Sequence, residues 1–112
     1  MRVTSELFVS ALIRRVFSSG RFAAVERKGA AEAGAIFIRQ RFRDGLERLY
    51  TPAPQTVFDE TDSGDRRFEL RLDHVEPGDV DALLVREARF DSDLWIVELE
   101  ADEIGDLVSL VA

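Results

Sequence analysis

Apolar residues recur at three- and four-residue spacing in two parts of the chain, near its start and in its last third. This spacing places them on one side of an α-helix and predicts an amphipathic helix over residues 5–18. Thr4 or Ser5 can cap its first turn. A second helix is predicted to begin at Pro77 and to stop by residues 91–93.

Four further stretches have the composition or the alternation of β-strands. Residues 22–28, 35–43 and 94–99 are rich in β-branched or aromatic side chains, and residues 67–74 alternate between apolar and charged positions. Residues 94–99 begin with consecutive apolar positions, which favours a central place in a sheet.

A hairpin is predicted where Asp44-Gly45 lies between two strand-like runs, because a type I′ turn needs positive φ at both central residues. Residues 46–51 are then the returning strand, which two prolines end. The polar residues 55–65 are expected to form a loop. Residues 102–111 are expected to form a short C-terminal helix, with a strand left open as an alternative.

These elements predict an α+β fold in a single domain, residues 1–112. The predicted sheet is small and antiparallel or mixed, with about five strands. An N-terminal helix, a second helix before the last strand and a short C-terminal helix accompany it. The simplest arrangement packs the helices on one face of the sheet, and a β-barrel is the alternative.

The predicted hairpin gathers arginines on one face. A two-residue turn places Arg41 opposite Arg48 and Arg39 opposite Tyr50. Opposed like charges are unfavourable by about 0.2–1 kcal/mol per pair, so we expect an anion to relieve them. The candidate binding residues share this face: Arg39, Arg41, Arg43, Arg48 and Tyr50. The anion is either a set of carboxylates of this chain or part of a ligand, and solvated arginines are the third interpretation.

Charge is divided between the two halves of the chain. Residues 1–50 hold ten Lys or Arg and five Asp or Glu, whereas residues 51–112 hold five Arg and seventeen Asp or Glu, and the net charge is −7. An acidic chain is poorly suited to coat nucleic acid, so we expect no nucleic-acid partner. The first apolar stretch, residues 7–13, is too short to span a bilayer, so we expect no membrane association and a cytoplasmic location.

Other patterns that could carry chemistry are weak. The chain has no cysteine and one histidine, His74, which leaves few members for a catalytic triad and no thiolate ligand for a metal. His74 is in phase with the apolar side of its strand and is expected to be a partly buried structural residue. Residues 28–34 hold two glycines around small residues but lack a nucleotide-binding fingerprint, so we interpret them as a turn.

Two groups of carboxylates are also interpreted structurally. The acidic residues Asp59, Glu60, Asp62 and Asp65 lack the spacing of an EF-hand and are expected to be solvated. Glu98 and Glu100 share one side of a strand, where a paired-carboxylate or metal site is the alternative to exposed strand ends. We expect no cofactor, no metal and no catalytic residues.

Three segments together resemble a family of short bacterial proteins classed only as a domain of unknown function. They are residues 2–15, residues 33–37 and residues 90–98, which spread over nearly the whole chain. The resemblance implies a small cytoplasmic bacterial protein and supplies no activity, cofactor or catalytic residue.

The function indicated by these patterns is a non-enzymatic binding or interaction module. Its expected partner is a second copy of the chain, in a homodimer, or an acidic protein. Two alternatives stay open: a hydrolytic enzyme that uses carboxylates or a metal near residues 94–99, and anion or nucleic-acid binding through the arginine-rich hairpin face.

Overall fold

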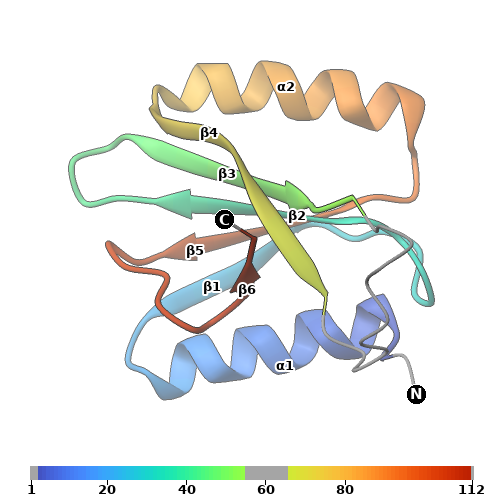
Figure 1. Ribbon diagram of the computed structural model, residues 1–112, viewed down its shortest axis with the longest axis horizontal. Helices are drawn as coiled ribbons and strands as arrows, with labels where there is room; N and C mark the ends of the chain where they lie inside the picture. Colours follow the sequence, from blue (N-terminus) through green and yellow to red (C-terminus); the bar gives the residue numbers. More distant parts are fainter. Residues whose placement is uncertain (1–2, 55–65, 112) are drawn as a thin grey trace.

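The computed structural model describes residues 3–54 and 66–111. This part of the chain has an α+β fold, as predicted, with two helices and one mixed sheet of six strands rather than about five (Figure 1). In chain order the elements are α1 (Ser5–Ser18), β1 (Phe22–Arg27), β2 (Ile36–Arg41), β3 (Glu47–Pro52), β4 (Arg67–Val75), α2 (Pro77–Phe90), β5 (Trp95–Glu100) and β6 (Ser109–Leu110). The strand order across the sheet is β1-β5-β2-β3-β4-β6, and β5 runs parallel to β2 but antiparallel to β1.

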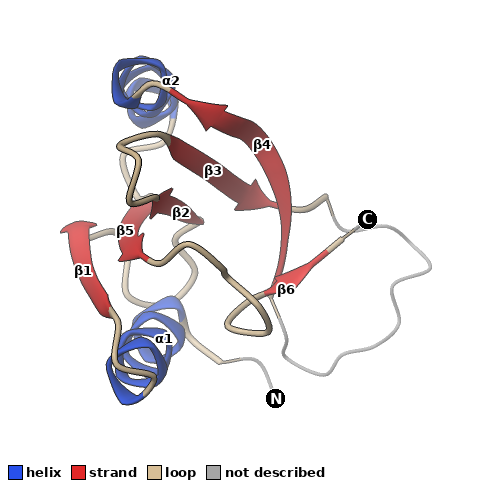
Figure 2. Ribbon diagram, turned by 90° about the vertical axis from the view of Figure 1, so that its left-hand side faces the viewer, coloured by secondary structure: helices blue, strands red, loops and turns tan. Residues whose placement is uncertain are grey.

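The two helices lie on opposite faces of the sheet, so the predicted packing on one face is wrong (Figure 1 and Figure 2). The interior strands explain the arrangement. Residues 36–40 of β2 and residues 95–97 of β5 are buried at consecutive positions, so both of their faces need an apolar cover. This cover is supplied by α1, which packs against β1 on one face, and by α2, which packs against β3 and β4 on the other.

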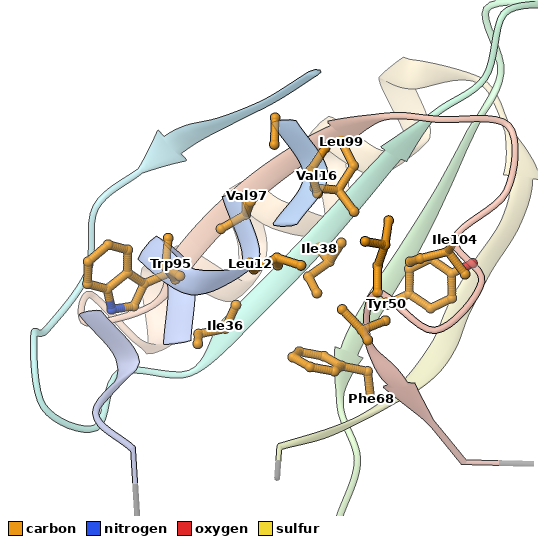
Figure 3. Close-up of a cluster of buried hydrophobic side chains, with 14 residues drawn as sticks. Leu12, Val16, Ile36, Ile38, Tyr50, Phe68, Trp95, Val97, Leu99 and Ile104 are labelled. Atoms are coloured by element: carbon orange, nitrogen blue, oxygen red, sulfur yellow. The ribbon is translucent and has the colours of Figure 1, made fainter. Parts of the chain in front are cut away.

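The larger core lies between α1 and the sheet (Figure 3). Leu12 and Val16 of α1 are fully buried against strand residues that include Ile38 and Val97. Trp95 is 3% exposed and belongs to the same cluster, so its ring fills the core. A second cluster under α2 joins Val80, Leu83 and Leu84 to apolar residues of β2, β3 and β5.

The predicted C-terminal helix is wrong, because residues 101–111 form turns and the short strand β6. Ile104, Leu107 and Val108 have helical spacing, but they are buried in the α1-side core from an irregular segment. Gly105 has φ +53, in the left-handed region, which interrupts a right-handed helix. The spacing therefore marked burial in the core rather than a helix.

The β2–β3 hairpin has a three-residue turn instead of the predicted two-residue turn. The amide of Phe42 donates to the carbonyl of Leu46, and the amide of Gly45 donates to the carbonyl of Phe42, each at 3.0 Å. Gly45 has φ +91 at the end of the turn, which is typical of a three-residue hairpin with a glycine bulge. The register shifts by one residue, so Arg41 faces Glu47.

The glycine-rich segment that joins β1 to β2 is a turn, as interpreted from the sequence. Its carbonyls at Ala31 and Glu32 accept the amides of Glu6 and Ser5, the first residues of α1, at 2.9 and 3.0 Å. The indole Nε1 of Trp95 donates to the carbonyl of Ala30 at 2.8 Å. Because these carbonyls satisfy the free amides at the start of α1, the segment fastens the helix to the sheet.

Candidate binding site

The five predicted binding residues do not share a face. Arg39 and Arg41 lie on the α2 side, where Arg39 reaches Asp81. A shift of one residue in register changes which side chains of β3 share that side with them. Arg48 and Tyr50 lie on the α1 side, where Tyr50 belongs to the core. Arg43 lies in the turn. The predicted common face, with Arg41 opposed to Arg48, is therefore wrong.

Arg39 is buried, with 4% of its side chain exposed, and is surrounded by carboxylates. Its Nε donates to Glu47 Oε1 at 2.5 Å, and its Nη1 lies 2.7 Å from Asp81 Oδ1 and 3.2 Å from Glu26 Oε1. Burial alone would lower the pKa of this guanidinium, but hydrogen bonds to Glu47 and Asp81 outweigh it and raise the pKa above its ordinary value. Arg39 therefore stays charged and joins β2 to β1, β3 and α2.

Arg41 is held more loosely, with 40% of its side chain exposed. Its Nη2 lies 3.1 Å from Glu98 Oε2 and 3.5 Å from Glu26 Oε1, and its Nε lies 3.3 Å from Glu47 Oε2. Together with Arg39 it faces four carboxylates, so this network carries excess negative charge. We call it the α2-side ion network: Glu26, Arg39, Arg41, Glu47, Asp81 and Glu98.

On the other side of the hairpin, Arg48 and Tyr50 have their own partners. Arg48 Nε donates to Asp73 Oδ1 at 2.5 Å, and this hydrogen bond raises the pKa of the guanidinium. Tyr50 is 2% exposed, and its hydroxyl donates to Gln40 Oε1 at 2.8 Å. Gln40 in turn donates to the carbonyl of Ala101 at 2.9 Å. Tyr50 is thus a buried structural residue and lacks the exposed ring that a stacking platform needs.

Arg41 and Arg43 come together again at one end of the sheet, in a cleft with a volume of about 620 Å³. We call it the sheet-end cleft. Its charged lining combines three arginines with three carboxylates: Arg21, Arg41, Arg43, Glu100, Asp102 and Glu103. Phe22 and Phe42 supply aromatic walls, and the amide of Arg43 donates to Asp102 Oδ1 at 2.9 Å across the cleft.

Three elements place these side chains. Phe22, at the start of β1, pairs with Glu100, at the end of β5, which brings Arg21 next to the carboxylates of residues 100–103. The β2–β3 turn contributes Arg43 from the neighbouring end of the hairpin. The arrangement offers guanidinium groups to an anion, carboxylates to a cation and rings to an apolar side chain.

Comparison with known proteins places the chain in a family. The family model described as "Protein of unknown function (DUF1491)" matches residues 3–109. The chain belongs to the DUF1491 family. This confirms the resemblance to a family without an assigned activity. None of the curated proteins matches the chain.

Solved structures of bacterial proteins share the fold. The solution structure of a protein from A. tumefaciens is 65% identical, with a TM-score of 0.88 and coverage of 99% of this chain and 96% of that chain. A crystal structure of a DUF1491 family protein from Caulobacter crescentus is 31% identical, with a TM-score of 0.80 and full coverage of both chains. An NMR structure from the same organism is 32% identical, with a TM-score of 0.79 and coverage of 100% of this chain and 99% of that chain.

Sequence reasoning missed Arg21, Asp102 and Glu103 as cleft residues of this DUF1491 protein. Arg21 lies far from Asp102 and Glu103 in the chain, and they meet only because β1 pairs with β5, a pairing that was not predicted from the sequence. The one available signal was charge, since Arg21 follows Gly20 directly before a strand and residues 98–103 are acidic.

The carboxylates that were considered for a catalytic or metal site do not form a metal-binding group among the described residues. Glu98, one of the strand carboxylates considered for a paired site, forms an ion pair with Arg41. The acidic residues 59–65 lie outside the described residues. Within residues 3–54 and 66–111, no three His, Asp or Glu side chains are grouped so that they could hold a metal ion. No helix in these ranges is long and apolar enough to cross a membrane.

His74 is more exposed than predicted, because its φ of +56 takes it out of the alternation of β4. Its ring lies 4.6 Å from that of Phe42, and its Nε2 lies 2.8 Å from Asp44 Oδ2 in the hairpin turn. The amide of Leu46 and the hydrogen bond with His74 lower the pKa of Asp44 below its usual value.

Because the pKa of Asp44 is lower in the folded than in the unfolded chain, its carboxylate stabilises the fold above the unfolded value of about 3.9. This contribution disappears as the pH falls through the folded-state pKa. We expect Asp44→Asn to be less stable than the native chain at pH 7, and the difference to shrink between pH 4 and pH 2. Urea denaturation at these pH values measures it, and a difference that does not change with pH would contradict the assignment.

Proposed function

We propose that this protein is a non-enzymatic interaction module that binds a charged segment of a protein partner in the sheet-end cleft. The observation that carries the proposal is the cleft lining, in which guanidinium groups, carboxylates and two phenylalanines face one space. These groups recognise charges and rings, and Arg41 and Arg43 keep the binding role that the sequence predicts for them. The bound segment supplies an acidic group to the arginines, which fits the predicted acidic partner.

Inorganic phosphate is a suitable probe for the arginine side of the cleft. In a titration followed by ¹H–¹⁵N NMR, we expect saturable shifts at the amides of Arg21, Arg41 and Arg43. Arg43→Gln should weaken phosphate binding about tenfold, because it removes an exposed guanidinium from the cleft. The backbone amide that donates to Asp102 is kept in this variant.

Arg86→Gln is the matched control, since Arg86 is an exposed arginine on α2 that does not line the cleft. It should leave the titration unchanged. Shifts that spread evenly over all exposed arginines, or phosphate affinity that is undiminished in Arg43→Gln, would contradict the proposed site.

Self-association stays a prediction, and two exposed apolar side chains on α2 support it. Phe90 is 87% exposed and Val85 is 55% exposed. The two positions are not at i, i+3 or i+4 spacing, so a two-fold contact at the C-terminal end of α2 would bury chiefly Phe90 of each copy. We expect a dimer in sedimentation equilibrium at high concentration and a monomer for Phe90→Ser, and a monomeric native chain under these conditions would refute the prediction.

A cytoplasmic location is likewise proposed. Its support is that the apolar residues near the start of the chain belong to the amphipathic helix α1, whose Val9, Leu12 and Val16 are buried in the core.

A further inference from the structure

The outer edge of β1 is an unpaired edge of the sheet over the described residues. β1 pairs with β5 on one side only and ends the strand order, as Figure 2 shows. The backbone groups on its other side are a template for one more strand. We propose that the partner segment binds as an added strand along β1, an inference that rests on the proposed function of the sheet-end cleft.

The edge of β1 carries apolar side chains that an added strand would cover. Phe22 is 44% exposed and Val25 is 41% exposed. Phe17, in the last turn of α1, is 52% exposed and lies edge-on to Phe22, with 5.7 Å between the ring centroids. Val25 pairs with Val97 of the α1-side core, so it points to the α1 side. Side chains of an added strand that point the same way would meet it and should therefore be apolar.

The opposite side of the same edge is acidic. Phe22 and Ala24 pair with Glu100 and Glu98, and Glu26 reaches the ion network on this side. Glu26 and Glu98 keep 29% and 20% of their side chains exposed, and Glu100 is exposed at the strand end. Because carboxylates outnumber guanidinium groups in the α2-side ion network, side chains that point this way should be basic.

The edge and the cleft are continuous. Phe22 begins β1 and also lines the sheet-end cleft, and so does Glu100 beside it. The regular part of the β1 ladder runs from Phe22 to Val25, because the register shifts between Val25 and Arg27. Four residues at about 3.3 Å each give roughly 13 Å of template. The geometry therefore fits a short extended segment that alternates basic and apolar residues and ends with its acidic group in the cleft.

An eight-residue peptide that alternates lysine with valine or threonine and has a free carboxyl end tests this inference. Two modified forms are needed: one N-methylated at the amides that would face β1, the other at the alternate amides, which would face solvent. Because the two forms carry the methyl groups on alternate sets of amides, one of them blocks the amides that face β1 whichever set that is. We expect one N-methylated form to bind at least tenfold more weakly than the parent and the other to bind equally well, because strand addition uses amides on one edge only.

Charge-reversed protein variants test the acidic side. Glu100→Lys should weaken binding of the parent peptide about tenfold, and the matched control Glu32→Lys, an exposed glutamate in the β1–β2 loop, should not. Chemical shift changes are expected along residues 22–25.

The outcomes separate the two proposals. Equal binding of both N-methylated peptides, or shifts that do not include residues 22–25, would overturn strand addition. The phosphate titration decides the cleft independently, so shifts in the cleft without an effect of N-methylation would leave the proposed function standing and remove only the added strand.

Discussion

Arg39→Ala is expected to lower the free energy of unfolding by about 3–5 kcal/mol. The substitution removes the cation between Glu47, of which 4% is exposed, and Asp81 of α2. Glu47 then remains as a buried carboxylate, and the cation left beside it among the described residues is the more distant Arg41. The whole free energy of unfolding of a small domain is about 5–15 kcal/mol. We therefore expect the midpoint of thermal unfolding to fall by roughly 10–20 °C.

Arg48→Ala is the matched control. Arg48 also donates to a carboxylate from β3, but 34% of its side chain and 56% of that of Asp73 are exposed. Exposed pairs of this kind contribute about 0–1 kcal/mol. Urea denaturation of both variants compares the two arginines directly. A loss for Arg39→Ala that is no larger than that for Arg48→Ala would show that the buried network does not stabilise the fold.

The double variant Arg39→Met with Glu47→Leu separates the loss of the ion pair from the cost of an unpaired carboxylate. Replacement of both buried charges by apolar side chains is often neutral in proteins. We therefore expect the double variant to be more stable than Arg39→Ala. A double variant that is less stable would indicate that the ion pair itself, rather than the stranded carboxylate, carries most of the effect.

The hairpin shows where prediction from this sequence stopped. Asp44-Gly45 correctly indicated the position of the turn, because glycine adopts positive φ readily. Two-residue and three-residue turns both accept a glycine there, and they differ by one residue in register. That difference reverses the side of the sheet on which Arg48 and Tyr50 lie relative to Arg39. The residue types of the site were therefore predictable, but their common face was not.

The elements were more predictable than their arrangement. The spacing of Leu12 and Val16 predicted α1, and the alternation after Arg67 predicted β4, because each pattern records which side chains meet the core. The side of the sheet chosen by each helix depends instead on strand order. That order also brings Arg21 to Glu100, so the sheet-end cleft depends on pairing over a long range of sequence.

Gly29→Ala is expected to destabilise the protein by about 3 kcal/mol, at the upper end of the usual range for overpacking. A Cβ atom at Gly29 would collide with the carbonyl oxygen of Asp93 and with the backbone of Leu94. The loop that holds Gly29 cannot move away freely, because the residues after Gly29 are hydrogen-bonded to Trp95 and to the first amides of α1. The collision therefore separates the loop from β5 or displaces the start of α1.

Trp95 reports this change, since it is the single tryptophan and its indole donates to Ala30, next to Gly29. Urea denaturation followed by tryptophan fluorescence gives the loss of stability, and a shift of the native emission maximum reports exposure of the ring. Gly78→Ala is the control of opposite sign: a Cβ there meets open space in the first turn of α2, and alanine favours helix over glycine by up to about 1 kcal/mol. If Gly29→Ala and Gly78→Ala had similar stability, the close approach of the β1–β2 loop to Asp93 would not be a constraint on the fold.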